Sequence, residues 1–241
     1  MRGTGRSPAG RPVTLLPMTF SIVAHCARTG QFGVAATTQM PAVGKLLAHA
    51  RAGVGAVATQ ARINPNLGID GTALLAVRLT ADATIEALRC TDPHFDRRQL
   101  AVVDRWGGTA AWTGPDCLPW AGAITRDGWS VQGNRLTGPD VLDALDAAMA
   151  ASVERPLADR LIDALEAGDA CGGDRKGENS ATIYVVDTED YPLWDIRVDH
   201  HPHPMHELRR LHGVFCRELL PEMARMPTRA DPGGSAAEHD A

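Results

Sequence analysis

The sequence lacks long apolar runs, a strong basic excess and an abundance of aromatic residues. No stretch approaches the roughly 18 consecutive apolar residues that a membrane-spanning helix requires. Aromatic residues make up only 5% of the chain, so alanine, valine and leucine must supply most of the core packing. The formal net charge is -5, which argues against a nucleic-acid footprint spread over the surface. We therefore expect neither a membrane nor a nucleic-acid partner.

The sequence also lacks a cysteine framework and a secretory signal. Its five cysteines are scattered, and no C-x-x-C pair occurs, which is typical of a protein in a reducing cytosol. The basic N-terminus contains only the apolar run 13–16 before Pro17, which is too short for a signal-peptide core. These features predict a cytoplasmic protein.

Cofactor-binding motifs are missing as well. No G-x-x-x-x-G-K-[ST] loop occurs, and the glycines of GVGAVA (53–58) begin a strand instead of joining a strand to a helix. We expect no cofactor.

The composition divides the chain into one folded region and two tails. Residues 1–17 are either a flexible extension or the product of a start site assigned too far upstream, and residues 226–241 are small and polar, as in a disordered tail. The hydrophobic fraction is 44%, which is enough for a full core, so residues 18–225 are predicted to form a single domain.

Periodicity predicts strands that arrive in hairpin pairs rather than singly between helices. Adjacent pairing of this kind favours antiparallel sheets with helices on their outer faces, that is, an α+β fold such as a four-layer α-β-β-α sandwich. The predicted strands cover 19–26, 31–38, 52–60, 99–104, 109–114, 128–134, 180–187 and 192–199, and the predicted helices cover 69–79, 82–90 with Asp82 as cap, 139–152, 156–167 and a last helix from Pro204.

Polar residues gather where several predicted strands end. Gln60, Asn64 and Asn66 follow one strand, and Gly133 and Asn134 close another. The glycine-rich loop 171–181 contains Gly173 and Asp174, and backbone N–H groups in such a loop can hold an anion. Converging uncharged donors of this kind suit a site that binds an amide or a carboxylate.

A histidine-rich segment, 199–212, is an alternative candidate site. Its possible ligands are Asp199, His200, His201, His203, His206 and His212. Because no H-E-x-x-H motif occurs and two prolines stiffen the backbone, we interpret the segment as a polar loop entering a helix and expect no metal.

Several stretches together resemble a widespread prokaryotic family of unassigned function. They are MTFSIVA, GVAATTQMPAVG, ARAGVGAVATQARINPN, VQGN, GGDRKGENSA and DIRVDHHPHPMHELRRL, which span Met18 to Leu211. That family is placed in the N-terminal nucleophile (Ntn) hydrolase superfamily, so the resemblance implies the α-β-β-α sandwich and an amidohydrolase acting on a small-molecule amide or related C–N bond. It does not supply a substrate.

The resemblance also implies a catalytic role for Thr19. Ntn hydrolases use the first residue of the mature chain as nucleophile, because its α-amine has a pKa near 7.7–8.0 and accepts the hydroxyl proton. Met18-Thr19 fits this pattern if Met18 is the initiator, since methionine is removed before a small residue. The 17 residues before Met18 depart from the family pattern.

Further roles follow from the resemblance by position. Thr38 and Gln39 are expected beside the nucleophile, Thr59 and Gln60 on the oxyanion side, and Lys45 is a candidate for lowering the pKa of the amine. By the same analogy, Asn134 or the Gly133 N–H is expected to complete the oxyanion hole, and Asp174 to orient the amine. The catalytic candidates are therefore Thr19, Asn134 and Asp174, and the substrate-binding candidates are Thr38, Gln39, Thr59, Gln60, Asn64, Gly133 and Gly173. By analogy we also expect a homo-oligomer. The alternative is a non-catalytic protein that binds a small ligand on the same scaffold.

Overall fold

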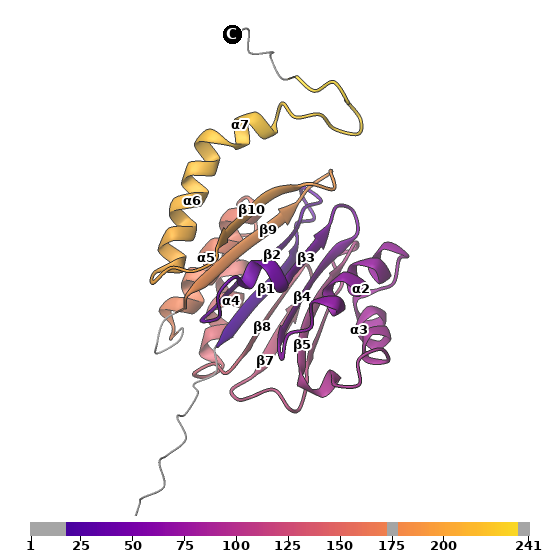
Figure 1. Cartoon of the computed structure of the whole chain (residues 1–241), viewed down its shortest axis with the longest axis vertical. Coiled ribbons are helices and arrows are strands. Elements are labelled where there is room, and N and C mark those ends of the chain that lie inside the picture. Colours follow the sequence, from indigo (N-terminus) through magenta and orange to yellow (C-terminus); the bar gives the residue numbers. More distant parts are fainter. Residues whose placement is uncertain (1–17, 173–177, 236–241) are drawn as a thin grey trace, which may run out of the picture.

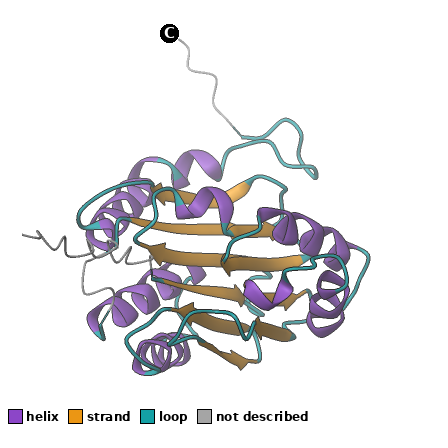
Figure 2. Ribbon diagram, turned by 60° about the horizontal axis from the view of Figure 1, so that its bottom comes forward, coloured by secondary structure: helices purple, strands orange, loops and turns teal. Residues whose placement is uncertain are grey.

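The computed structural model describes residues 18–172 and 178–235. The chain forms a mixed α+β fold with two antiparallel sheets, which lie face to face and carry helices on either side (Figures 1 and 2). The larger sheet has six strands in the order β10-β9-β2-β1-β8-β7, so β1 lies in its interior. Its strands are β1 (Thr19–His25), β2 (Phe32–Thr38), β7 (Gly122–Arg126), β8 (Trp129–Asn134), β9 (Ser180–Val186) and β10 (Pro192–Val198).

The smaller sheet has four strands in the order β3-β4-β5-β6. Each strand pairs with its sequence neighbour. Short turns join β3 to β4 and β5 to β6, whereas residues 62–97 separate β4 from β5. They are β3 (Ala48–Arg51), β4 (Gly55–Ala61), β5 (Arg98–Asp104) and β6 (Thr109–Thr113).

The predicted helices are present, with two corrections at their starts. The helix predicted from residue 69 begins at Pro65, because the Asn64 side chain caps it by accepting from Asn66 N and proline suits the first turn. The next helix is capped by Thr80 rather than Asp82, since Thr80 Oγ1 accepts from Ala83 N. The helical segments are α1 (Val43–Leu46), α2 (Pro65–Ala76), α3 (Ala81–Arg89), a 3₁₀ turn (Phe95–Arg97), α4 (Asp140–Ala151), α5 (Leu157–Ala170), α6 (Pro204–Glu218) and α7 (Leu220–Met223).

Several short elements were not predicted, among them β3, β7 and α1. β7 is a mostly exposed edge strand and β3 has only four residues, so neither shows an apolar alternation. The four-residue helix α1 is too short to show a helical period. Helix α1 matters for the site, because its Val43 borders the cavity described below.

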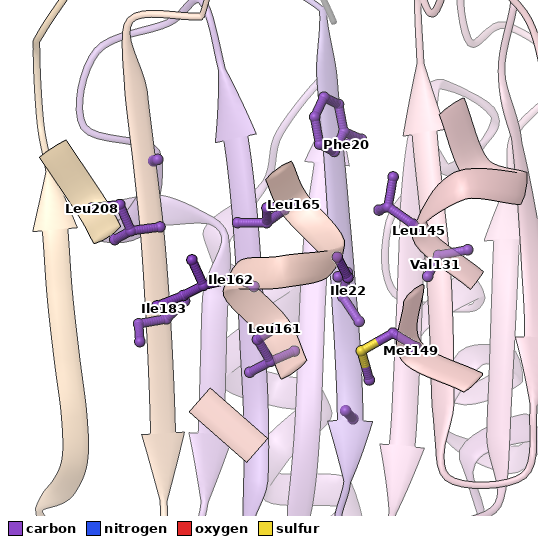
Figure 3. Close-up of a cluster of buried hydrophobic side chains, with 14 of the residues drawn as sticks. Phe20, Ile22, Val131, Leu145, Met149, Leu161, Ile162, Leu165, Ile183 and Leu208 are labelled. Atoms are coloured by element: carbon purple, nitrogen blue, oxygen red, sulfur yellow. The ribbon is translucent and has the colours of Figure 1, made fainter. Parts of the chain in front are cut away.

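Three apolar clusters lie between successive layers of secondary structure. In β4, Ala56 and Ala58 join the cluster between the sheets, whereas Val57 joins the cluster under the helices. This alternation follows from the two-residue period of a strand. The first cluster packs β1 against α4 and α5 (Figure 3), the second joins β1 and β2 to β4 and β5, and the third packs β4 and β5 against α2 and α3.

The segment after α7 contacts the turn between β9 and β10. Tyr191, between β9 and β10, donates its hydroxyl to Pro227 O at 3.1 Å, and Arg229 N donates to Glu189 Oε1 at 3.0 Å. Within residues 18–172 and 178–235, no helix is long and apolar enough to cross a membrane.

Candidate active site

Thr19 is the first residue of β1 and lies between two other site candidates. In the antiparallel register it stands opposite Thr38 of β2 on one side and Asn134 of β8 on the other. Thr38 and Asn134 are buried, and Thr19 is half-buried. The sheet pairing therefore brings together three residues that are far apart in the sequence.

The hydroxyl groups of Thr19 and Thr38 form a hydrogen bond with an Oγ1–Oγ1 distance of 2.9 Å. Thr38 Oγ1 also donates to the carbonyl oxygen of Met18 at 2.5 Å. A hydroxyl has one proton, so Thr38 must accept the hydrogen bond from Thr19. While Met18 is attached, the proton of the Thr19 hydroxyl therefore points toward Thr38.

A cavity of about 40 Å³ lies against Thr19. Its volume suits little more than a water molecule or two. Thr38 and Gln60 border it, as do residues from α1 and from the ends of β4 and β8. The full lining is Thr19, Thr38, Met40, Val43, Leu47, Gln60, Ala61, Ile63 and Arg135.

Arg135 is a site residue that the sequence analysis missed. It follows directly after β8 and has a φ of 60°, in the left-handed region that side chains other than glycine seldom adopt. Ala61, at the end of β4, has a φ of 66° and borders the same cavity. Burial lowers the pKa of the Arg135 guanidinium, and the nearby charge of Arg62 acts in the same direction. The position of Arg135 directly after VQGN was the only signal in the sequence.

A chain of buried amide groups connects the two sheets behind Thr19. Ser21 donates to Gln60 Oε1 at 2.7 Å, and Gln60 Nε2 donates to Gln99 Oε1 at 2.8 Å. Asn134 Nδ2 donates to the same Gln99 oxygen at 3.0 Å, and Gln132 Nε2 donates to Ser21 at 3.2 Å. All five residues are at most 1% exposed. The network fixes Gln60 and Asn134 and uses Ser21, Gln99 and Gln132, which the sequence analysis did not select.

The other candidates that the structure describes do not border the cavity. The backbone carbonyl of Gln39 accepts a hydrogen bond from Asn179 Nδ2, and the Thr59 hydroxyl donates to the backbone carbonyl of Asn64. Gly133 pairs with Phe20, and its carbonyl accepts from Gln99 Nε2 at 2.8 Å. Lys45 borders a different hollow, with Tyr184 and Asp195. Gly173 and Asp174 lie outside the described residues.

Asn64 has a structural task at the start of α2. Besides capping the helix, its Nδ2 donates to Asp92 Oδ2 at 3.0 Å. Asp92 also accepts from Arg98 Nε at 2.8 Å and from His94 N at 2.9 Å. Burial alone raises the pKa of the Asp92 carboxyl, but these hydrogen bonds and the charge of Arg98 outweigh burial and hold the pKa at about 2.

This low pKa predicts an acid-dependent contribution to stability. The Asp92 carboxyl has a pKa of about 2 in the folded chain and 3.8 in the unfolded chain. It therefore stabilises the fold above pH 3.8, and this stabilisation is lost as the pH falls through 2. The Asp92 side chain is only 6% exposed, so we expect Asp92→Asn to lower the free energy of unfolding by about 2 kcal/mol at pH 7 and to flatten its dependence between pH 4 and 2. Denaturant titrations over this pH range measure both effects.

Asp116→Asn is the matched control. Asp116 pairs with Arg97 at 3.8 Å, and both side chains are more than half exposed, so this variant should lose less than about 1 kcal/mol. Equal losses in the two variants would show that the Asp92 hydrogen bonds add nothing beyond an exposed ion pair.

The histidine-rich segment does not assemble a metal site within the described residues. The described part of the chain contains no group of three or more histidine, cysteine, aspartate or glutamate side chains that could hold an ion. His212 stacks on Trp194 with ring centres 4.7 Å apart and approaches Asp159 of α5, whereas His201 Nδ1 accepts from His203 N. The imidazoles are thus divided between the core and the loop.

Residues 19–208 match the family described as "Family of unknown function (DUF1028)". The chain belongs to this family. The matched range begins at Thr19 and ends at residue 208. None of the curated proteins matches the chain.

Two solved structures are similar to this DUF1028 member. Protein SPO2555 from Silicibacter pomeroyi, of the same family, is 28% identical with a TM-score of 0.83, covering 91% of this chain and 100% of its own. Anbu (ancestral beta-subunit) from Yersinia bercovieri is 12% identical with a TM-score of 0.37, covering 87% of this chain and 98% of its own. The fold described above is therefore a fold of the DUF1028 family.

Proposed function

We propose that this protein, once its chain begins at Thr19, is an Ntn-type amidohydrolase that cleaves a small-molecule amide or related C–N bond. The observation that carries the proposal is the position of the Thr19 hydroxyl: it lies at the start of an interior strand, beside a cavity, and 2.9 Å from the Thr38 hydroxyl. The family match, which begins at Thr19, supports the same boundary.

The order of the layers supports the proposal. Helices α4 and α5, the six-stranded sheet, the four-stranded sheet, and helices α2 and α3 follow one another, with an apolar cluster between each pair of neighbours. We propose that this arrangement is the four-layer α-β-β-α sandwich implied by the family resemblance.

Removal of Met18 supplies the base. The new α-amine of Thr19 has a reference pKa of about 7.7–8.0, so a useful fraction is neutral near pH 7 and accepts the proton of the Thr19 hydroxyl. The Thr19 oxygen then attacks the substrate carbonyl. The amine of the substrate leaves with the proton that the α-amine had accepted, and water hydrolyses the ester formed on Thr19. The Met18 carbonyl, which accepts from Thr38, leaves with Met18, so Thr38 can then donate to Thr19 or to its amine.

The proposal also requires that removal of Met18, which does not line the cavity beside Thr19, opens space for a substrate. Met18 is 5% exposed and belongs to the core cluster, and a cavity of about 40 Å³ is too small for an acyl group with its leaving group. We propose that the oxyanion is stabilised by Asn134, whose Nδ2 uses one of its two hydrogens on Gln99. The role of Asp174 in orienting the amine, and that of Gly173 in holding substrate, remain parts of this proposal.

The native N-terminus tests the proposal. We expect intact-mass measurement of the protein from its own cells to give the mass of a chain that begins at Thr19, because only a terminal threonine has the amine that the mechanism needs. A functional protein that retains Met18 or earlier residues would disprove the hydrolase.

One observation favours a second candidate, a protein that binds a small ligand without catalysis. The retained Met18 is well accommodated, since its side chain is buried and its carbonyl accepts a hydrogen bond from Thr38. A binding protein of this kind would keep its affinity in Thr19→Ala, whereas the hydrolase would lose turnover. A homo-oligomer and a cytoplasmic location are kept as expectations for either candidate.

A further inference from the structure

A second cavity, of about 680 Å³, lies at the opposite end of β1 from Thr19. It is bordered by His25, the last residue of β1, and the seven residues of this strand place it about 20 Å from Thr19. The β5–β6 turn, the β7–β8 turn, the loop between α4 and α5, and one side chain of α5 form its other walls. Its volume is within the range of small-molecule sites, about 300–1,000 Å³.

The side chain from α5 is Arg160, which is only 4% exposed. Its Nη2 donates to Met149 O at 3.1 Å, and its guanidinium carbon lies 5.9 Å from the centre of the Trp129 ring. Among residues 18–172 and 178–235, the Arg160 Nε finds no acceptor. No carboxylate in these residues lies within ion-pair distance of the Arg160 guanidinium. A buried cation without a counter-ion is costly, so this wall of the cavity favours an anion.

Two other groups on the cavity wall have the same electrostatic preference. Arg28 is held by hydrogen bonds from its Nη2 to the carbonyls of Glu154 and Arg155, at 3.0 and 3.2 Å, so its position at the rim is fixed. Burial raises the pKa of the Cys26 thiol, but hydrogen bonds from Thr29 and the charge of Arg160 bring it below its ordinary value. Most of this lowering of the Cys26 pKa comes from the hydrogen bonds, and the positive charge of Arg160 adds to it.

The rim of the cavity carries an exposed aromatic side chain. Trp106 is 61% exposed, although the turn that carries it is rigid, because Asp104 Oδ1 accepts from the backbone N–H groups of Trp106 and Gly108. Gly107, with a φ of 85°, supplies the left-handed conformation that this turn requires. An exposed indole on a hydrogen-bonded turn offers a flat apolar surface for stacking.

We propose that this cavity is a second ligand site, separate from Thr19, which binds a small organic acid: one compact oxyanion group toward Arg160 and Arg28, with a flat apolar body on Trp106. Two exposed carboxylates, Asp127 and Glu154, also border the cavity, and they favour a single oxyanion over a polyanion. The oxyanion is a carboxylate or a phosphate ester, since a guanidinium binds both.

Fluorescence titration of the full chain with benzoate and with phenyl phosphate tests this site. We expect one of the two to quench the tryptophan emission with a Kd in the millimolar range or tighter, and the better probe identifies the oxyanion. Acetate and inorganic phosphate lack the ring, and benzyl alcohol lacks the charge. Each of the three should bind at least about 10-fold more weakly than the better aromatic anion. If neither aromatic anion binds below about 10 mM, the proposal is overturned.

Two variants assign the binding to these side chains. Arg160→Met should lower the affinity for the better probe at least about 10-fold. It should not lower the melting temperature of the unliganded chain, because it removes an uncompensated buried charge. If that variant does not fold, Trp106→Ala still tests the site, because the Trp106 side chain is exposed. We expect its affinity for the better probe to fall about 5-fold, as measured by calorimetry. Unchanged affinity in Trp106→Ala, or in folded Arg160→Met, contradicts the proposal, whereas Thr19→Ala should bind like the parent.

Discussion

Thr19→Ala, in a chain that begins at residue 19, is expected to reduce acyl turnover on the order of 10³-fold or more. The substitution removes the attacking oxygen and leaves the α-amine, Thr38 and the strand pairing in place. Release of p-nitrophenolate from p-nitrophenyl acetate measures the effect, because this activated ester needs only a nucleophile, a base and room for an acetyl group. The initial burst reports acylation, and the steady rate reports release of the acyl group.

Thr19→Ser is the matched control for this experiment. It keeps a hydroxyl at the same position and should retain activity within about 10-fold of the parent chain. Thr38→Val, at the hydrogen-bonded neighbour, should have an intermediate effect, because Thr38 orients the nucleophile but does not react. If Thr19→Ala turns over the ester as fast as the parent, the nucleophile is elsewhere.

Gln99→Leu should be the most destabilising single substitution in the polar layer between the sheets, lowering the free energy of unfolding on the order of 4 kcal/mol. Gln99 is fully buried, and its amide accepts from Gln60 and Asn134 and donates to Gly133 O. Leucine leaves the buried Gln60 and Asn134 amides without this acceptor, at about 1–3 kcal/mol each, and removes a donor from Gly133 O. Urea titration measures the loss.

Thr113→Val isolates a single hydrogen bond of the same network. Thr113 Oγ1 accepts from Gln99 Nε2 at 3.0 Å and lies toward the edge of the layer, so we expect a loss of only about 1 kcal/mol. If Gln99→Leu costs no more than Thr113→Val, the amide network does not stabilise the packing of the two sheets. A stable Gln99→Leu variant should also turn over the ester more slowly, because Asn134 loses its anchor.

The sequence predicted the sheets better than it predicted the site. Strand alternation identified β1, β2, β4, β5, β6, β8, β9 and β10, because each has an apolar face in a cluster. Pairing Thr19 with Thr38 and Asn134 depends on register across three separate strands. Strand propensity carries no such information. Asn134 was selected as a polar residue at a strand end, whereas Thr19 and Thr38 were selected only through the resemblance to a family.

Gln99 and Arg135 were each missed for a physical reason, whereas Asn64 was selected and has a structural task. Gln99 lies inside an apolar strand, where a lone amide in the sequence gives no sign that it meets Gln60 and Asn134 across the layer. Arg135 borders the cavity because of a left-handed φ, which its side chain does not favour. Asn64 was selected for its polarity, yet its side chain caps α2 and binds Asp92.

The most direct test of the central claim is the site of acylation by a β-lactone, read by intact mass and peptide mapping. The hydroxyl oxygen forms an ester with the lactone carbonyl carbon, the ring C–O bond breaks, and the hydroxyl proton passes through the amine to the new alkoxide. We predict one adduct, on Thr19, in the chain that begins at residue 19, and none in the chain that retains Met18. Thr19→Ala, which keeps a terminal amine, distinguishes ester formation from simple amine acylation. An adduct on another residue, equal labelling of both chains, or no adduct at all would contradict Thr19 as the nucleophile.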